Sequence, residues 1–408
     1  MSTPSVLLIP DLLKAGKLYS QIPNSGAVDF DVTRATTAFR TNASGVLESV
    51  ASGVPRLDYP IGGGCPSLLV EPAATNLLLR SEEFNDASWS KIFSSITANA
   101  GIAPNGTLTA DSLIPNTTLE QHRVDQTPSS TAASQVFTIY AKSNGYSFIG
   151  MRFGLAGALF NLSNGLVSLV GAGLSATTQN AGNGWYRCTL IKAAGVANEA
   201  VRINVSLGAA IAENFAGDGT SGVLLWGAQL EVGSVATSYI PTVAATATRN
   251  ADVISKTGVS GFIGQAQGTL YAEFVAGNFN STNQRRVVCI SDGTLNNRII
   301  IGGILNQNNR FQAVVVVAGV TDVQIIQTVD MPQNSIIKAA IAYSTNDVVF
   351  YINGVQIGLD TSVSIPACNR FDVGNLLGSE QFINGAIRTA ATYPIRLSNA
   401  QLASLTTL

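Results

Sequence analysis

Histidine chemistry is confined to one residue of this sequence. His122, the single histidine, lies in the segment Glu120–Asp125 (EQHRVD) beside Arg123, whose charge opposes protonation of the imidazole. A catalytic triad needs a nucleophile and an orienting acid around the histidine, and no G-x-S-x-G nucleophile elbow is present. We therefore expect His122 to be an ordinary surface or loop residue without a catalytic role.

Paired carboxylates are the second chemistry to consider, because two acids at a defined separation suffice for glycoside hydrolysis. The 25 acidic residues include no E-x-E or D-x-D pair on a strand of either sandwich predicted below. The nearest local pair, Glu213 and Asp218, falls in a loop, which is a poor place to fix two carboxylates. The sequence therefore predicts no enzyme and no catalytic residue, with a polysaccharide depolymerase as an alternative.

Metal and cofactor binding also lack a recognisable motif. Four cysteines are far apart and form no CxxC pair, so we expect isolated thiols packed as small apolar groups. Four aspartates near predicted strand ends carry oxygen ligands suited to calcium, but the EF-hand spacing is absent. The sequence therefore predicts no metal site and no cofactor. The residues concerned are Cys65, Cys188, Cys289 and Cys368, and Asp292, Asp347, Asp360 and Asp372.

Charge and composition exclude further classes of protein. Charged residues make up 12% of the 408 residues, and 23 basic residues face 25 acidic ones. A surface that follows phosphates needs an excess of Lys and Arg, so we expect no nucleic-acid partner. The 46% hydrophobic content predicts a folded chain rather than a disordered one. A binding or structural role fits this composition best.

Membrane and export signals are missing from the sequence. The first 20 residues lack a charged start followed by a long apolar core, so they do not predict a signal peptide. No stretch approaches the 18 apolar residues of a membrane span; the run Ala313–Val320 is short and bracketed by Arg310 and Asp322. We expect a soluble protein without membrane insertion.

The elements that position any site are predicted to be strands. Apolar runs are short, rich in β-branched residues and separated by six Asn-Gly and two Asp-Gly dipeptides, which favour hairpin turns. The clearest hairpin is Asp347–Gly358 around Asn353-Gly354, and short helices are expected only at Pro10–Leu18 and Ser398–Leu405. Further predicted strands are Ser134–Ala141, Arg202–Leu207, Val223–Leu230, Thr269–Val275, Arg298–Ile304, Arg310–Val317 and Ile337–Tyr343.

This pattern predicts an all-β fold with two β-sandwich, jelly-roll-like modules in tandem. Apolar periodicity lapses in residues 29–59, so residues 1–80 are predicted to form an extended N-terminal attachment segment. The first sandwich is predicted over residues 81–240 and the second over residues 259–408. The Thr/Ala-rich residues 241–258 between them are predicted to be a linker with little to bury.

Three stretches resemble a recurring module of tailed-bacteriophage virion proteins, found in tail fibres and in head-fibre or head-spike proteins. They are VTRATTAFRTNASGVLESVASGVPRLDYP with LLVEPAATNLLLRSEEFNDASW, within Val32–Trp89; GNGWYRCTL, Gly182–Leu190; and WGAQLEVGSVATSYIPTVAATATRNADV, Trp226–Val253. The C-terminal part, from GTLYAEF through VVFYINGVQIG to NGAIRTAATYPIRLSNAQLASL, resembles a concanavalin-like or laminin-G-like sandwich.

The resemblance implies a virion protein whose middle module resembles carbohydrate-binding jelly rolls and which adsorbs to host cell-surface glycan as a tail fibre or receptor-binding protein. It also implies a homotrimer that contacts other phage tail or capsid proteins and is made in the host cytoplasm. The alternative within the same family is a head-fibre or capsid-decoration protein with a structural role. The resemblance supplies no enzymatic residue.

Three residues are candidates for glycan contact. Trp89, in the polar stretch EEFNDASWSK, is the tryptophan most readily exposed, and an exposed indole stacks on the apolar face of a sugar. Arg285 and Arg286 are predicted at a loop tip, where guanidinium groups contact acidic glycans or lipopolysaccharide phosphates. Trp185 and Trp226 are expected in the core, while Arg56, Asp58 and Glu71 are expected to form weak surface ion pairs.

Overall fold

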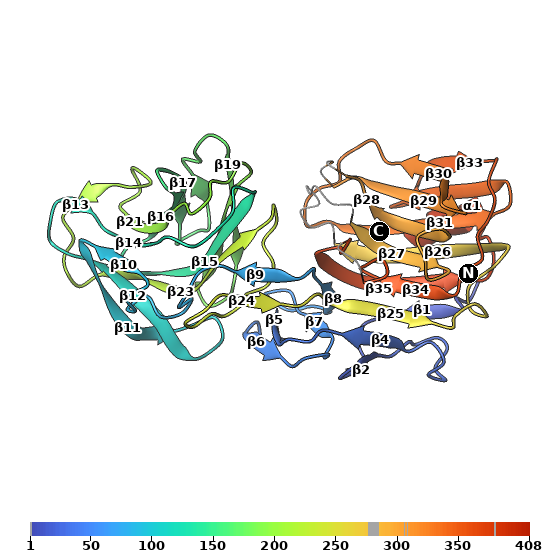
Figure 1. Ribbon diagram of the computed structural model, residues 1–408, viewed down its shortest axis with the longest axis horizontal. Coiled ribbons are helices and arrows are strands. Elements are labelled where there is room, and N and C mark those ends of the chain that lie inside the picture. The colour runs from blue at the N-terminus through green and yellow to red at the C-terminus, as the bar shows by residue number, and fades with distance from the viewer. Residues whose placement is uncertain (1, 276–284, 306, 308, 379–380) are drawn as a thin grey trace.

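The chain folds into two lobes of antiparallel strands joined at a waist (Figure 1). The computed structural model describes residues 2–275, 285–305, 307, 309–378 and 381–408. Within that part of the chain one short helix accompanies the strands, and the predicted all-β sandwich class is confirmed. No described helix has the length and apolar character needed to cross a membrane.

The middle sandwich is made of two six-stranded sheets that pack face to face. Its core contains Phe137, Phe153 and Ile203 from the facing surfaces, together with Trp89 from a loop. Sheet 1 consists, in spatial order, of β10 (Ser90–Ile92), β14 (Arg123–Gln126), β21 (Val201–Ser206), β16 (Phe148–Phe153), β17 (Ala156–Asn161) and β18 (Val167–Ser168). Sheet 2 consists of β11 (Ser94–Ile102), β12 (Leu108–Pro115), β23 (Gly222–Val232), β15 (Gln135–Asn144), β20 (Tyr186–Lys192) and β19 (Leu174–Asn180).

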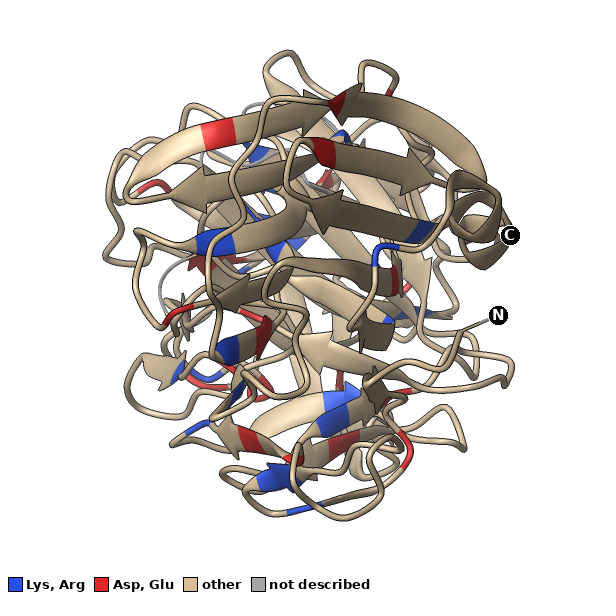
Figure 2. Ribbon diagram, turned by 90° about the vertical axis from the view of Figure 1, so that its right-hand side faces the viewer, with Lys and Arg blue, Asp and Glu red and all other residues tan. Residues whose placement is uncertain are grey.

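The terminal sandwich is built from both ends of the chain, and its strands carry few charged positions on the side seen in Figure 2. Sheet 3 consists of β33 (Val355–Asp360), β32 (Asp347–Ile352), β31 (Ile336–Ser344), β26 (Gln267–Val275), β35 (Gly385–Tyr393), β8 (Ser67–Val70) and β7 (Arg56–Asp58), with β1 (Val6–Leu8) on β35. Sheet 4 consists of β2 (Leu13–Lys14), β3 (Lys17–Leu18), β4 (Phe30–Thr33), β25 (Val253–Thr257), β34 (Arg370–Val373), β27 (Arg286–Ser291), β28 (Arg298–Gly303), β29 (Phe311–Val317) and β30 (Val320–Ile326).

The N-terminal residues belong to this terminal sandwich, which differs from the separate segment predicted over residues 1–80. Val6, Leu18 and Phe30 are fully buried in the same core as Ile341 and Phe350. The contributing strands are two to four residues long, too short to show a period in the sequence. The predicted virion-attachment role of this segment stays a proposal.

The predicted linker over residues 241–258 is also structural rather than a free connector. β24 (Ala247–Arg249) pairs with β9 (Ala74–Asn76) at the waist, and β25 lies between β4 and β34 within sheet 4. Ile254, on β25, is 1% exposed and lies in the core. The small and polar residues around Ile254 give no sign of this burial in the sequence. The burial depends on β34 and β4, which lie about 120 and 220 residues away along the chain.

Two of the predicted local elements are confirmed and one is wrong. The Asn353-Gly354 turn joins β32 to β33, with positive φ at both residues. The C-terminal helix α1 (Asn399–Thr406) forms with Ser398 as its N-cap. The helix predicted at Pro10–Leu18 is instead the β2–β3 hairpin, because Gly16 takes a φ of 80° and turns the chain.

Removing the helix cap should open α1 selectively. The Ser398 hydroxyl accepts a hydrogen bond from the Gln401 amide (3.3 Å), and the Gln401 side chain accepts one from the Ser398 amide (2.9 Å). Ser398→Ala is expected to lower the free energy of opening of this helix by about 1 kcal/mol. Hydrogen exchange of the helix amides measures this. Ser175→Ala, at an exposed position of β19, is the control and should leave these amides unchanged; equal exchange in both variants would contradict the capping role.

All four cysteines are free thiols, and the predicted packing as small apolar groups is confirmed for three of them and wrong for Cys65. Cys188, Cys289 and Cys368 are buried, whereas Cys65 is exposed. Burial raises the pKa of the Cys368 thiol to about 12. The three buried cysteines therefore act as small apolar side chains of the cores.

Candidate functional site

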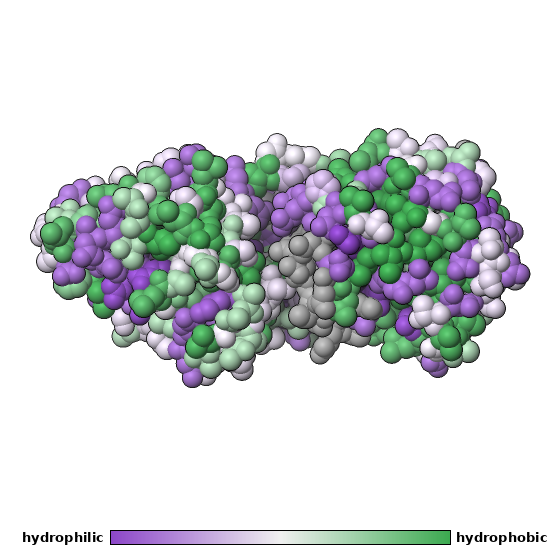
Figure 3. Space-filling view, turned by 90° about the horizontal axis from the view of Figure 1, so that it is seen from above, coloured by the Kyte–Doolittle hydropathy of each residue, from purple (hydrophilic) through white to green (hydrophobic). Residues whose placement is uncertain are grey.

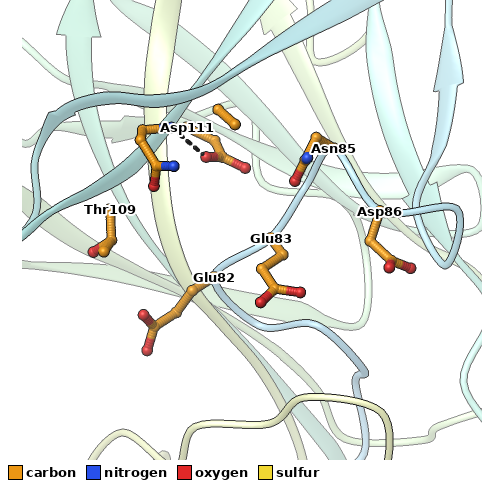
Figure 4. A pocket seen from close by; sticks show the side chains of 8 residues that line it. Glu82, Glu83, Asn85, Asp86, Thr109 and Asp111 are labelled. Carbon is orange, nitrogen blue, oxygen red and sulfur yellow. Dashed lines mark hydrogen bonds between the residues drawn. The ribbon is translucent and has the colours of Figure 1, made fainter.

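A pocket of about 330 Å³ opens on the middle sandwich, between the loop of residues 82–86 and strands β11 and β12 (Figure 4). Its lining is almost entirely polar and contains four carboxyl groups, two amides and one hydroxyl. The lining residues are Glu82, Glu83, Asn85, Asp86, Ala98, Asn99, Thr109 and Asp111. We call this the acidic pocket.

Trp89 anchors the loop of the acidic pocket from below. The loop advances by successive turns, in which the amides of Glu83, Asp86 and Trp89 donate to the carbonyls of Arg80, Glu83 and Asp86. The Trp89 indole is 1% exposed, contacts the Phe84 ring at 4.9 Å and donates from Nε1 to the Arg80 carbonyl (3.1 Å). The predicted exposure of Trp89 is therefore wrong: its indole fills the core and has no free face for a sugar.

Asp111 ties the loop to the sheet. Its two carboxylate oxygens accept hydrogen bonds from the Phe84 amide (2.8 Å) and from the Asn99 amide (2.9 Å), so β12, β11 and the loop share one carboxylate. Asn99 has a positive φ of 54°, which asparagine tolerates better than most residues. Burial raises the pKa of Asp111, although the backbone amides oppose that effect.

Glu82 lies over a buried aromatic layer on the outer face of sheet 2. It accepts a hydrogen bond from the Tyr239 hydroxyl (2.9 Å), and Thr109 accepts one from Trp226 Nε1 (3.1 Å). The Trp226 and Tyr239 rings pack at 4.5 Å beneath this polar surface. Burial raises the pKa of Glu82, and the bond from Tyr239 opposes this shift only in part. The floor of the pocket is therefore fixed by packing and not by loop conformation alone.

The remaining two acids are paired with one arginine at the rim. Arg80 lies 2.6 Å from Glu83 and 3.3 Å from Asp86, and these side chains are partly exposed. Figure 4 shows the Glu82, Glu83 and Asp86 side chains spread along the loop and not gathered at one point. Among the residues that the structure describes, no cluster of three or more metal-ligating side chains occurs. The pocket thus offers separated hydrogen-bond acceptors, which suit a ligand with several hydroxyl groups.

The stretches that carry the sequence resemblance meet around this pocket. The hydroxyl groups of Ser81 and Tyr239 form a hydrogen bond of 2.7 Å, which links the first stretch to the third. Gly227 has a positive φ of 65°, and a Cβ atom there would lie 3.1 Å from the Tyr140 ring. Trp185 is buried and donates to the Ile102 carbonyl (3.1 Å). Trp185 and Trp226 are both core residues, as predicted.

A buried ion cluster lies at the waist of the molecule. Arg34 lies 2.8 Å from Asp252, Arg56 bonds both Asp252 and Glu71 (2.7 Å to Glu71), and Arg249 lies 3.3 Å from Glu71. Glu71 also accepts from the Ser238 amide (2.7 Å) and hydroxyl (2.6 Å). We call these five charged residues the waist cluster. Their side chains are at most 5% exposed, so the surface pairing predicted for Arg56 and Glu71 is a buried network.

Arg285 and Arg286 do not lie on a loop tip. They are 8% and 4% exposed, and Arg286 begins β27 inside sheet 4. Arg285 donates to the Ile383 carbonyl (3.3 Å) and Arg286 donates from Nε to the Gln381 side chain (2.8 Å). Burial lowers the pKa of each guanidinium to about 10. Neither presents a free fork for a glycan; the preceding residues 276–284 lie outside the described part of the chain.

His122 is buried and not a surface residue. Its ring is 0% exposed and lies with Nδ1 2.5 Å from the Phe93 carbonyl and Nε2 2.7 Å from the Phe215 carbonyl. The imidazole thus links sheet 1 to the β13–β22 pair (Glu120–Gln121 and Asn214–Phe215). Both ring nitrogens are occupied by backbone groups, which leaves no atom for acid–base work.

The other acids considered in the sequence have local structural partners. Glu213 accepts from the Leu207 amide (3.0 Å), and Asp218 accepts from the amides of Thr220 (2.8 Å) and Ser221 (2.7 Å). The aspartates considered for calcium are likewise occupied locally. Asp292 accepts from Thr294 and Asn297, Asp347 from Arg396, Asp360 from Ser362 and Asp372 from Arg370.

Sequence reasoning missed the residues that line the acidic pocket. The only local signal was the three acids within Glu82–Asp86, shortly before Trp89. Asn99, Thr109 and Asp111 reach the pocket from β11 and β12, and no local pattern marks them. Their grouping depends on the pairing of β11 with β12 and on the loop folding over both.

Comparisons with known proteins assign no family. No family model matches the sequence, and no curated protein matches it. Among solved structures, a carbohydrate-binding module of the IT-sialidase of Ruminococcus gnavus, bound to α2,3-sialyllactose, is 13% identical. That comparison covers 35% of this chain and 83% of the module, with a TM-score of 0.29.

Two other solved structures show a similar degree of likeness. Domain 4 of an extracellular arabinanase from Geobacillus stearothermophilus, in complex with arabinotriose, is 16% identical over 43% of this chain and 82% of that chain, with a TM-score of 0.32. Domains LG4-5 of the mouse laminin α1 chain are 11% identical over 68% of this chain and 88% of that chain, with a TM-score of 0.24. These values are too low to assign the chain to the family of any of these proteins.

Proposed function

We propose that this protein is a bacteriophage virion surface protein, a tail fibre or receptor-binding protein, that adsorbs to host cell-surface glycan through the acidic pocket. The observation that carries the proposal is the pocket itself, with separated carboxylate, amide and hydroxyl groups on a packed floor. The virion assignment is supported by the sequence resemblance, whose stretches form the pocket loop and the waist cluster.

The chemistry of the pocket fits a neutral or variable sugar. Carboxylates accept hydrogen bonds from sugar hydroxyls, and amides both donate and accept them. No aromatic ring lines the pocket, so a single contact would be weak. Copies held in one assembly turn weak contacts into firm adhesion.

A homotrimer is part of the proposal, and exposed apolar side chains on the terminal sandwich supply a surface for subunit contacts. Val320 on β30 and Val355 and Leu359 on the neighbouring β33 are exposed. Figure 3 shows hydrophobic residues gathered over this lobe on the side where β30 and β33 lie in Figure 1. Sedimentation should give three times the chain mass of 42.4 kDa; a monomer at micromolar concentration would contradict the trimer.

Loss of pocket groups should weaken glycan binding without unfolding the chain. The Asn85 side chain is exposed in the pocket, so Asn85→Ala removes an amide at little structural cost, and Glu82→Gln removes one charge. Glu82→Gln is expected to bind bacterial surface glycans at least tenfold more weakly on an array, because a lost hydrogen bond to a charged group is worth about 1.5–3 kcal/mol. Asn85→Ala loses a neutral hydrogen bond, worth about 0.5–1.5 kcal/mol, and should bind up to about tenfold more weakly. The control is Asn24→Ala, at an exposed position of the terminal sandwich. Equal binding by all three variants would remove the pocket from the proposal.

Two assays separate the proposed function from its alternatives. Purified protein should block adsorption of the particle to its host, and no competition at saturating dose would overturn the receptor-binding role. Labelled antibody on particles should mark the tail; labelling of the capsid would identify the head-fibre alternative. Release of reducing ends from host polysaccharide would instead support a depolymerase, whereas we propose no enzyme.

A further inference from the structure

Besides the acidic pocket, the middle sandwich has a second cluster of polar side chains. It lies on the outer face of sheet 1, on the side away from the core. Cross-strand registers place Asp125 opposite Arg202 and Arg123 opposite Asn204, and pair Arg202 in turn with Arg152 on β16. The residues between them, such as Val124, Ile203 and Met151, face the core. Because side chains alternate along a strand, the five polar residues share the outer face. We call them the arginine face.

Positive charge exceeds negative charge on the arginine face. Asp125 lies 3.1 Å from Arg123 Nε and 3.6 Å from Arg202 Nε, so one carboxylate serves two guanidinium groups. Arg152 has no carboxylate within ion-pair distance among the described residues, and it donates from Nη1 to Gln121 Oε1 at 3.4 Å. Burial, with the charges of Arg202 and Arg123, lowers the pKa of Arg152.

Several buried polar atoms of this face have no hydrogen-bond partner. Asn204 is 0% exposed, and neither its amide nitrogen nor its oxygen bonds to any described residue. Asp125 Oδ1, Arg152 Nε and Arg202 Nε are likewise buried without a hydrogen bond. These five atoms come from four residues that neighbour one another across three strands. Unsatisfied buried polar groups cost about 1–3 kcal/mol each. Three of the five atoms, Asn204 Nδ2, Arg152 Nε and Arg202 Nε, are donors, and their grouping points to an acceptor as the partner.

The surrounding chain is shaped to keep these side chains in place. A Cβ atom at Gly157 would lie 2.6 Å from Arg152 Cγ, so the glycine makes room for the arginine stem. At Gly150, opposite Asn204, a Cβ atom would lie 1.8 Å from the Ile211 carbonyl oxygen. The glycine, which has no Cβ, therefore lets the loop that contains Ile211 pack against the sheet. Arg123 and Arg202 keep 21% and 23% of their side chains exposed and form the open side.

We propose that the arginine face binds an oxyanion, the carboxylate or phosphate group of an acidic glycan, with Arg152 and Asn204 as its buried donors. A guanidinium fork and an amide N–H match two oxygens of such a group, and charge-assisted bonds of this kind are the strong ones. The anion supplies the negative charge that Arg152 lacks. This site lies on sheet 1, whereas the acidic pocket lies on sheet 2 and its loop, so it goes beyond the proposed function.

The test measures anion binding by the full-length protein. D-glucuronate and inorganic phosphate are titrated separately, with glucose as the neutral probe, while calorimetry and the Asn204 side-chain amide resonances are followed. One or both anions should bind saturably and shift these resonances, and glucose should not. Arg152→Gln should weaken binding at least tenfold, and Arg152→Lys, which keeps the charge but loses the fork, should weaken it less. The control Arg310→Gln removes a partly exposed arginine of the terminal sandwich, which pairs with Asp330, and should leave anion binding unchanged.

Each outcome of this test either identifies the chemical group of the ligand or overturns the proposed anion site. Binding of glucuronate alone identifies a carboxylate source, and binding of phosphate identifies a phosphate source. Absence of saturable binding by both anions, or equal binding by wild type and both Arg152 variants, overturns the proposal. The pocket variant Asn85→Ala should leave anion binding intact, so failure here is distinguishable from failure of the proposed glycan pocket.

Discussion

Glu71→Gln is expected to lower the free energy of unfolding by about 3–5 kcal/mol at pH 7, because it leaves buried arginines short of a partner. Glu71 contacts Arg56 (2.7 Å) and Arg249 (3.3 Å) and accepts two hydrogen bonds from Ser238. The variant leaves Asp252 alone against three guanidinium groups at the waist. Urea denaturation of both proteins measures the difference.

The effect of this substitution should depend on pH with a defined sign. Burial alone would raise the pKa of Glu71, but the charges of Arg56 and Arg249 outweigh it and lower the pKa to about 2, from an ordinary value of 4.5. A carboxyl group with a lowered pKa stabilises the fold above its ordinary pKa and loses that contribution as the pH falls through the folded value. The difference between the two pKa values corresponds to about 3 kcal/mol. The gap between wild type and variant should therefore be full above pH 5 and shrink steadily toward pH 2.

A matched substitution on the surface separates burial from charge. Glu48 pairs with Arg40 at 2.6 Å, but its side chain is 36% exposed, so solvent screens the pair. Glu48→Gln should cost at most about 1 kcal/mol and show little dependence on pH over the same range. Equal losses for Glu71→Gln and Glu48→Gln would show that the waist cluster contributes no more than a surface pair.

Trp89→Ala is expected to lower the free energy of unfolding by about 3–5 kcal/mol and to weaken glycan binding at the same time. The first effect follows from the cavity left by a fully buried indole. The second follows because Trp89 holds the Arg80 carbonyl and the Phe84 ring, between which the loop places Glu82 and Glu83. Denaturation measures the first effect, and the glycan array measures the second.

Two companion variants identify the source of these losses. Trp89→Phe keeps an aromatic ring and loses the Nε1 hydrogen bond, so it should lose less stability and retain binding in proportion. Leu155→Ala, at a side chain 84% exposed, should stay within about 0.5 kcal/mol of wild type. If Trp89→Ala destabilised the fold but left glycan binding intact, the loop would not depend on the indole for its position.

The middle of each sandwich was predictable because its strands are long and its turns are marked. In the terminal sandwich, β26, β29 and β32 carry enough β-branched and aromatic residues to define strands from local pattern alone, and Asn353-Gly354 fixes one hairpin register. The N-terminal strands were not predictable, since β4 pairs with β25 more than 200 residues later. Two to four residues contain no period, and only the partner strand determines their burial.

The burial of the candidate site residues was likewise not predictable from their local sequence. A tryptophan in a polar stretch suggested exposure, but the indole of Trp89 is drawn into the core because its N–H finds the Arg80 carbonyl there. Charge alone suggested that Arg285 and Arg286 are solvated, yet the strand that follows carries them inside. Arg56 and Glu71 were recognised as partners, while their burial depends on Arg249 and Asp252, distant in sequence.

The origin of the terminal sandwich in both ends of the chain has a consequence for synthesis and evolution. The N-terminal strands β1, β4 and β8 must wait for β25 and β35, which are synthesised later, whereas the middle sandwich is complete once residue 240 has emerged. The middle sandwich is thus an insertion, entered and left through β9 and β24, which pair side by side. Recombination at these two adjacent crossings would exchange the whole middle sandwich, while the terminal sandwich kept both chain ends and its own core.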